Sequence, residues 1–302
     1  MSFWKRTTHR HQQKAKLCSS GKAYPSSAAV ITDAREHLPD APYLLPKDAQ
    51  EQSRLNFQHH ALYNAIGNHY LAPLRPDVTT ILDVGTGTGI WPTEMAYLFP
   101  RTHIVGVDIS ATALEYASSP TCTFCLADVL KGLPFPDQQF DYVHQRLLVA
   151  AIPAANWPGV LRELVRVTRP GGWVELLEIG VTVQQAGPET TYLLDWMAEQ
   201  SKKHGFDMHV ISQLGKMLAQ TGLEAVECHE IPVPLGDWAG RVGSMLKVDV
   251  LSAFDALKGA YCAQANVPLE QFEALVTRVA QECEQYHASY VFHAAYGKRG
   301  QQ

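Results

Sequence analysis

The feature that most constrains the fold is the stretch at residues 81–108, which reads ILDVGTGTGIWPTEMAYLFPRTHIVGVD. A short apolar run ends in three glycines spaced by single residues (Gly85, Gly87 and Gly89), and a second apolar run ends in Asp108. Glycine has no side chain, so such a turn lets the backbone approach a ligand closely. In open parallel sheets, ligands bind at the carboxyl ends of the strands. The stretch therefore predicts a ligand site, with Asp108 placed to accept hydrogen bonds from ribose hydroxyls.

The spacing of the glycines distinguishes between classes of adenine nucleotide. A dinucleotide site has the pattern G-x-G-x-x-G, but the residues three positions after Gly87 and Gly89 are Ile90 and Pro92. A phosphate-binding loop has the pattern G-x-x-x-x-G-K-[ST], and no lysine follows these glycines. What remains is D-x-G-x-G-x-G. Its first residue, Asp83, suits a cationic amino-acid moiety and is badly placed for a phosphate.

From residue 79 onward, apolar strand-like segments alternate with helical ones. This order is typical of α/β proteins, in which a parallel sheet carries helices on both faces. We expect one domain over residues 43–302, with a first helix at about 48–70 and a small helical cap at about 185–221 and 236–286. Residues 1–42 form an N-terminal arm that is either flexible or exchanged between subunits.

The glycine pattern resembles motif I of the class I S-adenosylmethionine-dependent methyltransferases. Residues 126–146 and 161–178 resemble later motifs of that family. The resemblance implies a Rossmann-like, mostly parallel sheet of seven strands with N-terminal helices, and S-adenosylmethionine as the cofactor. It implies that Asp83 and the glycine loop receive the methionine end, Asp108 the ribose and Asp128 the adenine amino group. The cofactor-binding residues predicted in this way are Tyr43, Gln58, His59, Asp83, Gly85, Thr86, Gly87, Gly89, Asp108, Ile109, Asp128, Val129 and Gln145.

A narrower resemblance lies upstream of the glycine loop. Residues 43–60, YLLPKDAQEQSRLNFQHH, are similar to a pattern of the LaeA-like methyltransferases of secondary metabolism, and the similarity extends over about residues 43–299. That group contains small-molecule methyltransferases and regulators without a settled acceptor. The resemblance implies a hydrophobic small-molecule acceptor. The alternative is a regulatory protein that binds the cofactor and acts through protein partners.

The sequence offers three candidates for a catalytic base, which is needed only if the acceptor must lose a proton. His144, at the end of the fourth expected strand, is the first candidate, followed by Glu178 and His60. Two simpler interpretations stay open. His144 could hydrogen-bond a neighbouring loop without taking part in chemistry, and His59 and His60 could be a helix–sheet packing pair.

Aromatic residues in the expected cap and loops are candidates for an apolar acceptor pocket. The candidates are Trp91, Trp157, Tyr192, Trp196, Phe206 and Trp238. Such a wall would also suit carbon methylation of an alkene, because aromatic faces stabilise a developing cation. Each of these residues could equally be ordinary core. Cys122 and Cys125 form a single CxxC without a second pair, so we expect buried thiols and no metal site.

The distribution of charge disfavours a nucleic-acid substrate. Residues 1–22 hold six Lys or Arg and no acid, which leaves 19 basic against 30 acidic residues in the remainder. Nucleic-acid affinity rests largely on basic neutralisation of phosphates. The N-terminus has no apolar segment typical of a secretory signal, and no apolar run is long enough to cross a membrane. We therefore expect a cytoplasmic protein, and an association between copies through the N-terminal arm is possible.

Overall fold

The computed structural model describes residues 45–112 and 121–301. The arm expected at residues 1–42 and the candidate Tyr43 lie outside the described residues, as do residues 113–120. The described residues fall within one compact unit, residues 35–302. None of the helices in the described ranges combines the length and the apolar character that a membrane span requires.

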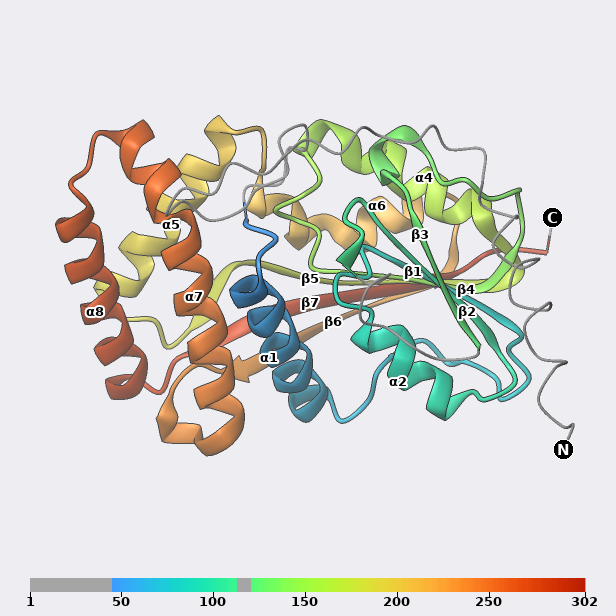
Figure 1. The fold of residues 1–302 in the computed structure, drawn as a ribbon, viewed down its shortest axis with the longest axis horizontal. Coiled ribbons are helices and arrows are strands. Elements are labelled where there is room, and N and C mark those ends of the chain that lie inside the picture. The colour runs from blue at the N-terminus through green and yellow to red at the C-terminus, as the bar shows by residue number, and fades with distance from the viewer. Residues whose placement is uncertain (1–44, 113–120, 302) are drawn as a thin grey trace, which may run out of the picture. The chain divides into compact units, whose positions relative to one another are not determined.

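The centre of the fold is a seven-stranded sheet with the order β3-β2-β1-β4-β5-β7-β6 (Figure 1). The neighbouring strands from β3 through β2, β1 and β4 to β5 pair in parallel. The strand β7 is antiparallel to both of its neighbours, β5 and β6. The predicted α/β fold with a mostly parallel sheet is therefore confirmed. The strands are β1 (Thr80–Val84), β2 (His103–Asp108), β3 (Cys122–Leu126), β4 (Phe140–Arg146), β5 (Thr168–Gln184), β6 (Glu224–Pro234) and β7 (Ser289–Lys298).

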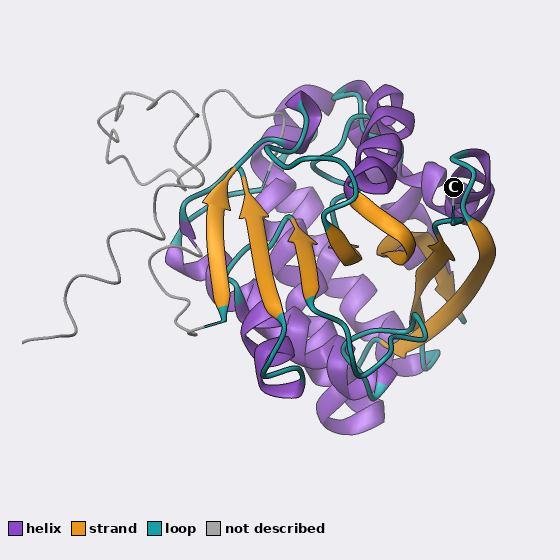
Figure 2. Cartoon of the chain, turned by 90° about the vertical axis from the view of Figure 1, so that its right-hand side faces the viewer, coloured by secondary structure: helices purple, strands orange, loops and turns teal. Residues whose placement is uncertain are grey.

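Helices cover both faces of this sheet, which twists from strand to strand (Figure 2). In Figure 1, α1 and α2 lie on one side of the sheet, α4 and α6 lie on the other, and α5, α7 and α8 gather beyond its end. The helices are α1 (Ala49–Ile66), α2 (Ile90–Leu98), α4 (Trp157–Val167), α5 (Pro188–Lys203), α6 (Leu214–Gln220), α7 (Gly240–Ala265) and α8 (Leu269–Gln285), with short 3-10 turns η2 (Val129–Lys131), η3 (Ala154–Asn156), η4 (Met208–Gln213) and η5 (Asp237–Ala239).

Separate apolar clusters fill the two faces. The alternation along β1 shows this, because Ile81 packs with Trp91 and α2 while Leu82 packs with the cluster around α4. The same alternation separates the CxxC thiols. Cys122 packs against the first cluster and Cys125 belongs to the second, so the two side chains leave β3 on opposite faces. Of the two thiols that were expected to be buried, Cys125 is buried and Cys122 is half-buried.

The helix α1 begins where its sequence indicates, but it ends at Ile66, before the expected end at about residue 70. The side chain of Asp48 accepts a hydrogen bond from the Glu51 backbone N–H at 2.9 Å, as an N-cap does. Gly67 ends the helix in the left-handed region at φ 74°. The Glu51 side chain does not return to the cap as a full capping box would require, because it is bonded to Arg54.

Candidate functional site

The glycine loop connects β1 to α2 through left-handed backbone. Gly85, Gly87 and Gly89 have φ of 73°, 56° and 75°. L-residues with larger side chains rarely adopt these angles, which explains why glycine recurs at alternate positions. At Gly85 there is also no room for a side chain, because an added Cβ would lie 2.5 Å from a methyl carbon of Leu148. The Gly87 N–H is directed to Asp108 and donates to its Oδ2 at 2.8 Å.

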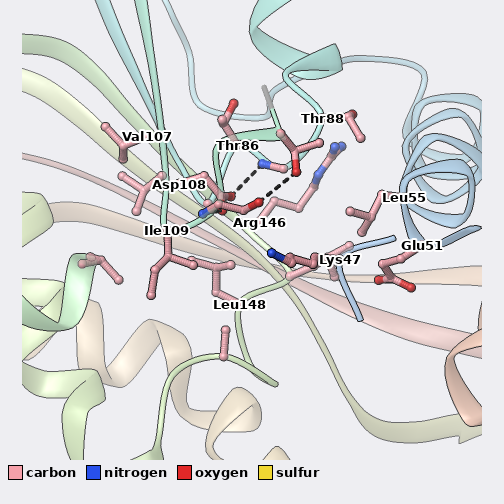
Figure 3. Close-up of a pocket in the computed structure, with 18 of the residues that line it drawn as sticks. Lys47, Glu51, Leu55, Thr86, Thr88, Val107, Asp108, Ile109, Arg146 and Leu148 are labelled. Carbon is pink, nitrogen blue, oxygen red and sulfur yellow. Dashed lines mark hydrogen bonds between the residues drawn. The ribbon is translucent and has the colours of Figure 1, made fainter. Parts of the chain in front are cut away.

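A cavity of about 1290 Å³, counting the space that opens to solvent, lies against this loop (Figure 3). It is formed at the carboxyl ends of β1 to β4, with α1 and its preceding segment opposite. The predicted residues that line it are Gln58, Gly85, Thr86, Gly87, Asp108, Ile109, Asp128 and Val129. Gly89, His59, Asp83 and Gln145 are not part of its wall.

Asp108 has the geometry of a hydroxyl-binding acid. Its Oδ1 accepts from the Ser110 N–H at 2.8 Å and its Oδ2 from the Gly87 N–H. The Ile109 N–H is a further donor to this carboxylate, so about one of its four lone pairs remains for a ligand. Burial raises the pKa of Asp108 to about 6, although these backbone hydrogen bonds act in the opposite direction. Ligand hydroxyls that donate to this side chain would stabilise its ionised form.

Asp128 lies one strand further along the sheet, after β3. Its side chain caps η2 by accepting from the Leu130 N–H at 3.0 Å, and it pairs with Lys131 at 3.0 Å. Asp128 and Val129 both line the cavity, at the positions where the family resemblance expects contacts to adenine.

Asp83 is turned away from the cavity, contrary to its expected contact with the methionine end. It is 3% exposed, and its two oxygens accept from Thr86 Oγ1 at 2.6 Å and His144 Nδ1 at 2.7 Å. Because Asp83 precedes the loop by only two residues, its side chain lies beneath the turn. There it holds the loop through Thr86.

His144 does not reach the cavity wall either. Its ring is parallel to the indole of Trp91, with centroids 3.9 Å apart and an interplanar angle of 3°, and it is 2% exposed. The simpler interpretation expected His144 to hydrogen-bond a neighbouring loop, whereas its partner is Asp83 of the neighbouring strand β1.

Glu178 holds the loop that follows β4. It is fully buried, and its carboxyl oxygens accept from the N–H groups of Leu148 and Val149, each at 3.0 Å. Burial raises the pKa of Glu178 to about 8. Gln145 Nε2 donates to Glu178 Oε1 at 3.4 Å, and Gln145 Oε1 has no hydrogen-bond partner among the described residues.

The three residues of the upstream segment QHH, Gln58, His59 and His60, lie in three different environments. Gln58 lines the cavity and donates to Asp249 of α7 at 2.9 Å. His59 is fully buried and contacts Glu94 and Arg146, and burial lowers its pKa to about 2. His60 is exposed on α1 and does not line the cavity, so the structure does not bring this third candidate base to the site.

A buried ion cluster joins α1 to α7. Arg54 donates to both oxygens of Glu51, at 2.5 Å and 2.8 Å, and to Asp249 at 2.5 Å. Gln58 bonds the other Asp249 oxygen. The E-x-x-R-x-x-x-Q spacing of the upstream pattern therefore places three polar side chains on one face of α1, where they meet Asp249.

None of the six expected aromatic residues lines the cavity. Trp91, Trp157 and Phe206 are buried in the core, Trp196 packs with α7 and α8, and Tyr192 and Trp238 are exposed. The apolar wall is aliphatic and contains Leu55, Ile90, Leu147, Leu148, Ala151 and Ile152. Large rings bury more area in a core than at a pocket edge, which explains the location of Trp91, Trp157 and Phe206. Alkene methylation through aromatic faces therefore has no support in the described residues.

Arg146 is a cavity residue that was not among those expected from the sequence. It is the last residue of β4, it lines the cavity, and its Nη2 donates to His59 Nδ1 at 3.1 Å. Its position could have been found from the sequence, since the carboxyl end of a strand in such a sheet faces the ligand. The residue expected there was His144, which lies two positions earlier on the same face of the strand.

His59, His69 and Glu94 bring three potential metal-ligand atoms within 4.8 Å of one another. The hydrogen bonds argue against a metal there. An arginine can only donate, so His59 Nδ1 accepts from Arg146, and His59 Nε2 must carry the proton donated to Glu94 at 2.7 Å. No lone pair remains on Nε2 for a metal ion.

Comparisons with known proteins agree with this geometry. The family described as a methyltransferase domain matches residues 81–172. Methyltransferase pytC of Aspergillus terreus is 32% identical over 71% of this chain and 69% of its own length. Secondary metabolism regulator laeA of Aspergillus fumisynnematus is 31% identical over 45% of this chain and 36% of its own length. The structure of Haemonchus contortus phosphoethanolamine N-methyltransferase 2, solved with S-adenosylhomocysteine and phosphomonomethylethanolamine, has a TM-score of 0.52. It is 17% identical and covers 87% of this chain and 62% of that one.

The sheet order, the left-handed glycine loop and the acid at the end of β2 define a class I nucleotide-binding methyltransferase fold. The chain belongs to the S-adenosylmethionine-dependent methyltransferases, and it is similar to fungal proteins of that kind such as pytC and, over part of its length, laeA. The cavity suits this cofactor, because Asp108 offers an unused lone pair to a hydroxyl and the loop at Gly87 carries no side chain.

Proposed function

We propose that the protein transfers a methyl group from S-adenosylmethionine to a hydrophobic small molecule of natural-product metabolism. The observation that carries this proposal is the continuous cavity, which runs from Asp128 and Asp108, past the glycine loop, to an aliphatic wall on α1 and the loop after β4. One end has the polar groups for an adenosine, and the other has room and apolar surface for a second molecule. The similarity to fungal methyltransferases supports the assignment to natural-product metabolism.

In the proposed reaction, the chain acts by binding and alignment. The cofactor supplies a methyl carbon that its sulfonium already activates. Asp108 and Asp128 hold the nucleoside end, and Gly87 keeps the wall open beside it. Leu55 and Ile152 exclude water from the acceptor side. Correct alignment alone accounts for a large part of a displacement of this kind, on the order of 7–11 kcal/mol at best.

The cavity wall contains no histidine among the described residues, and its carboxylates are already engaged. Glu51 is bonded to Arg54, and Asp108 and Asp128 lie at the nucleoside end. This arrangement favours an acceptor atom that reaches the site as a nucleophile without help from a general base.

The alternative function is a cofactor-binding regulator that acts through protein partners, and the similarity to laeA supports it. Turnover distinguishes the two. The purified protein is incubated with methyl-labelled S-adenosylmethionine and low-molecular-weight fungal extracts, and label in solvent-extractable products is counted. Labelled product would support the enzyme. Tight binding of S-adenosylhomocysteine without label in any extract would contradict it and favour the regulator.

A Gly87→Asp variant is the negative control for that experiment. Aspartate tolerates the left-handed backbone at this position better than most residues, so the fold should survive. Its carboxylate would extend toward the cavity and obstruct the cofactor. We expect no labelled product from this variant. A cytoplasmic location, the absence of a nucleic-acid partner and association through residues 1–42 stay predictions.

A further inference from the structure

The acceptor side of the cavity contains a cation, Arg146, that makes no direct ion pair with the residues the structure describes. Arg146 extends from the end of β4 toward Thr88 and α1 (Figure 3). Within the described ranges, no carboxylate oxygen lies within 4.0 Å of its guanidinium. The one hydrogen bond that the guanidinium makes there goes to a neutral imidazole nitrogen, His59 Nδ1, at 3.1 Å.

The charge of Arg146 is retained despite its surroundings. Burial lowers its pKa, and the carboxylates of Asp83 and Glu94 act in the opposite direction. A guanidinium stays protonated under such shifts because its ordinary pKa exceeds 12. A partly buried cation without an ion pair carries a desolvation cost that an anionic ligand would remove.

His59 holds Arg146 in a fixed orientation. His59 Nε2 donates to Glu94 at 2.7 Å, which leaves Nδ1 as the acceptor for Arg146. The pKa of His59 is lowered to about 2, first by burial and then by Arg146, so the ring stays neutral at all physiological pH values. His69 stacks on His59 with centroids 5.8 Å apart and approaches Glu94 at 3.4 Å. The guanidinium therefore needs little reordering before it binds a ligand.

The order of the strands places Arg146 beyond the expected cofactor contacts. Asp128, Asp108 and Gly87 follow β3, β2 and β1, and Arg146 ends β4, the next strand in the sheet. The aliphatic residues Leu147, Leu148 and Ile152 continue the wall beside it. Lys47 approaches the same cavity from the segment before α1 and offers a separate cation for the carboxylate of the cofactor (Figure 3).

We propose that Arg146 binds an anionic oxygen of the methyl acceptor, and that the acceptor is therefore a hydrophobic molecule with a carboxylate, phenolate or enolate group. The planar fork of a guanidinium matches two such oxygens, or one oxygen through two N–H groups. An acceptor that is ionised on binding also accounts for a cavity wall without a free general base. The proposal depends on the proposed small-molecule methyl transfer and specifies its substrate class.

The first experiment measures the preference for anions with a defined probe. Calorimetry in the presence of saturating S-adenosylhomocysteine compares 4-phenylbutyrate with its neutral analogue 4-phenylbutyramide. We expect the wild-type protein to bind the carboxylate at least about tenfold more tightly. Arg146→Met should remove this preference, and Arg146→Lys should retain part of it. Arg162→Met, which changes an exposed arginine on α4, is the matched control and should behave as wild type. An equal preference in wild type and Arg146→Met would overturn the proposal.

The second experiment separates the acceptor from the cofactor as the source of the anion. S-adenosylhomocysteine and its decarboxylated analogue are titrated into wild type and Arg146→Met. We expect the variant to change the affinity for S-adenosylhomocysteine less than threefold. A loss of tenfold or more that spares the decarboxylated analogue would assign Arg146 to the cofactor carboxylate and refute the proposal. These are binding measurements, so their outcome is distinct from a failure to detect methyl transfer.

A third variant tests the orientation of Arg146 through another residue and serves if Arg146→Met does not fold. Glu94 is one-third exposed, and its removal leaves His59 free to carry its proton on Nδ1, which then cannot accept from Arg146. We expect Glu94→Ala to reduce the carboxylate preference about threefold or more. If Glu94→Ala kept the wild-type preference for the carboxylate, Arg146 would not be the group that binds the anion while His59 orients it.

Discussion

Asp83 and His144 are bonded directly across β1 and β4, with Asp83 Oδ1 2.7 Å from His144 Nδ1 and with the two residues opposite each other in the strand register. Both side chains are buried. The second oxygen of Asp83 accepts from Thr86 Oγ1, so the pair supports the glycine loop from beneath. Its effect on methyl transfer is therefore expected to act through the shape of the cofactor site.

The first prediction concerns the loss of this support. His144→Ala leaves a buried carboxylate without one of its donors, which costs roughly 1–3 kcal/mol. We expect the affinity for S-adenosylhomocysteine to fall about tenfold, because the loop loses order. Calorimetry on wild type and variant measures this. His60→Ala, which alters an exposed residue on the neighbouring helix, is the control and should bind as wild type. A His144→Ala variant with wild-type affinity would show that the pair does not hold the loop.

The second prediction concerns the pH dependence of cofactor binding. The pKa of Asp108 is raised to about 6 by burial, and ligand hydroxyls would donate to its ionised form. Binding then requires the loss of a proton at lower pH. We expect the affinity for S-adenosylhomocysteine to be constant above pH 7 and to fall by up to about tenfold per pH unit below pH 6. Asp108→Asn should bind weakly at every pH between 5 and 8, with a flat profile. A steep profile in this variant would assign the titration to another group.

The sequence allowed the sheet to be predicted because its signals are local. The apolar run before the glycines forms β1 and the run that ends in Asp108 forms β2, and buried strands of a parallel sheet need such runs. The glycine loop was predictable for a similar reason, since Gly85 and Gly87 need left-handed backbone that only glycine adopts readily. The positions of Asp108 and Asp128 in the cavity wall were predictable because each residue lies at or just after the carboxyl end of a strand.

The roles of the polar side chains could not be predicted, because they depend on contacts between distant segments. His144 and Arg146 share one face of β4. The sequence around them does not show that Trp91 covers His144 and leaves Arg146 open to the cavity. Arg54 and Asp249 are separated by 195 positions, so their bond is visible only in the folded chain. The upstream pattern was recognisable, but its physical role in joining two helices was not.

The third prediction concerns that bond between α1 and α7. Arg54 balances the charges of Glu51 and Asp249, all three of which are buried. Arg54→Met leaves two buried carboxylates without a counter-charge, and we expect it to lower the free energy of unfolding by roughly 3–5 kcal/mol. Asp249→Asn should cost less, because Glu51 still pairs with Arg54. Urea denaturation of both single variants and the double variant gives the coupling energy. Additive effects would contradict a direct interaction.

The fourth prediction concerns Glu178 and the pH dependence of stability. Its pKa is about 8 in the folded protein and 4.5 when exposed, so the folded state holds a proton that the unfolded state releases between these values. Its contribution to stability is fully present below pH 4.5 and is lost as the pH rises toward 8, with a slope of about 1.4 kcal/mol per pH unit.

Glu178→Gln lacks this titration, but its amide nitrogen cannot accept from one of the two N–H groups of Leu148 and Val149. The variant should therefore be less stable than wild type by roughly 1–3 kcal/mol at pH 5. Because the wild type loses roughly 3–4 kcal/mol between pH 5 and pH 8, this deficit should vanish or reverse by pH 8. Urea denaturation at pH 5, 6.5 and 8 tests this. A deficit that stays constant over this range would mean that Glu178 is already ionised in the folded protein, and that the loop after β4 is held by a carboxylate.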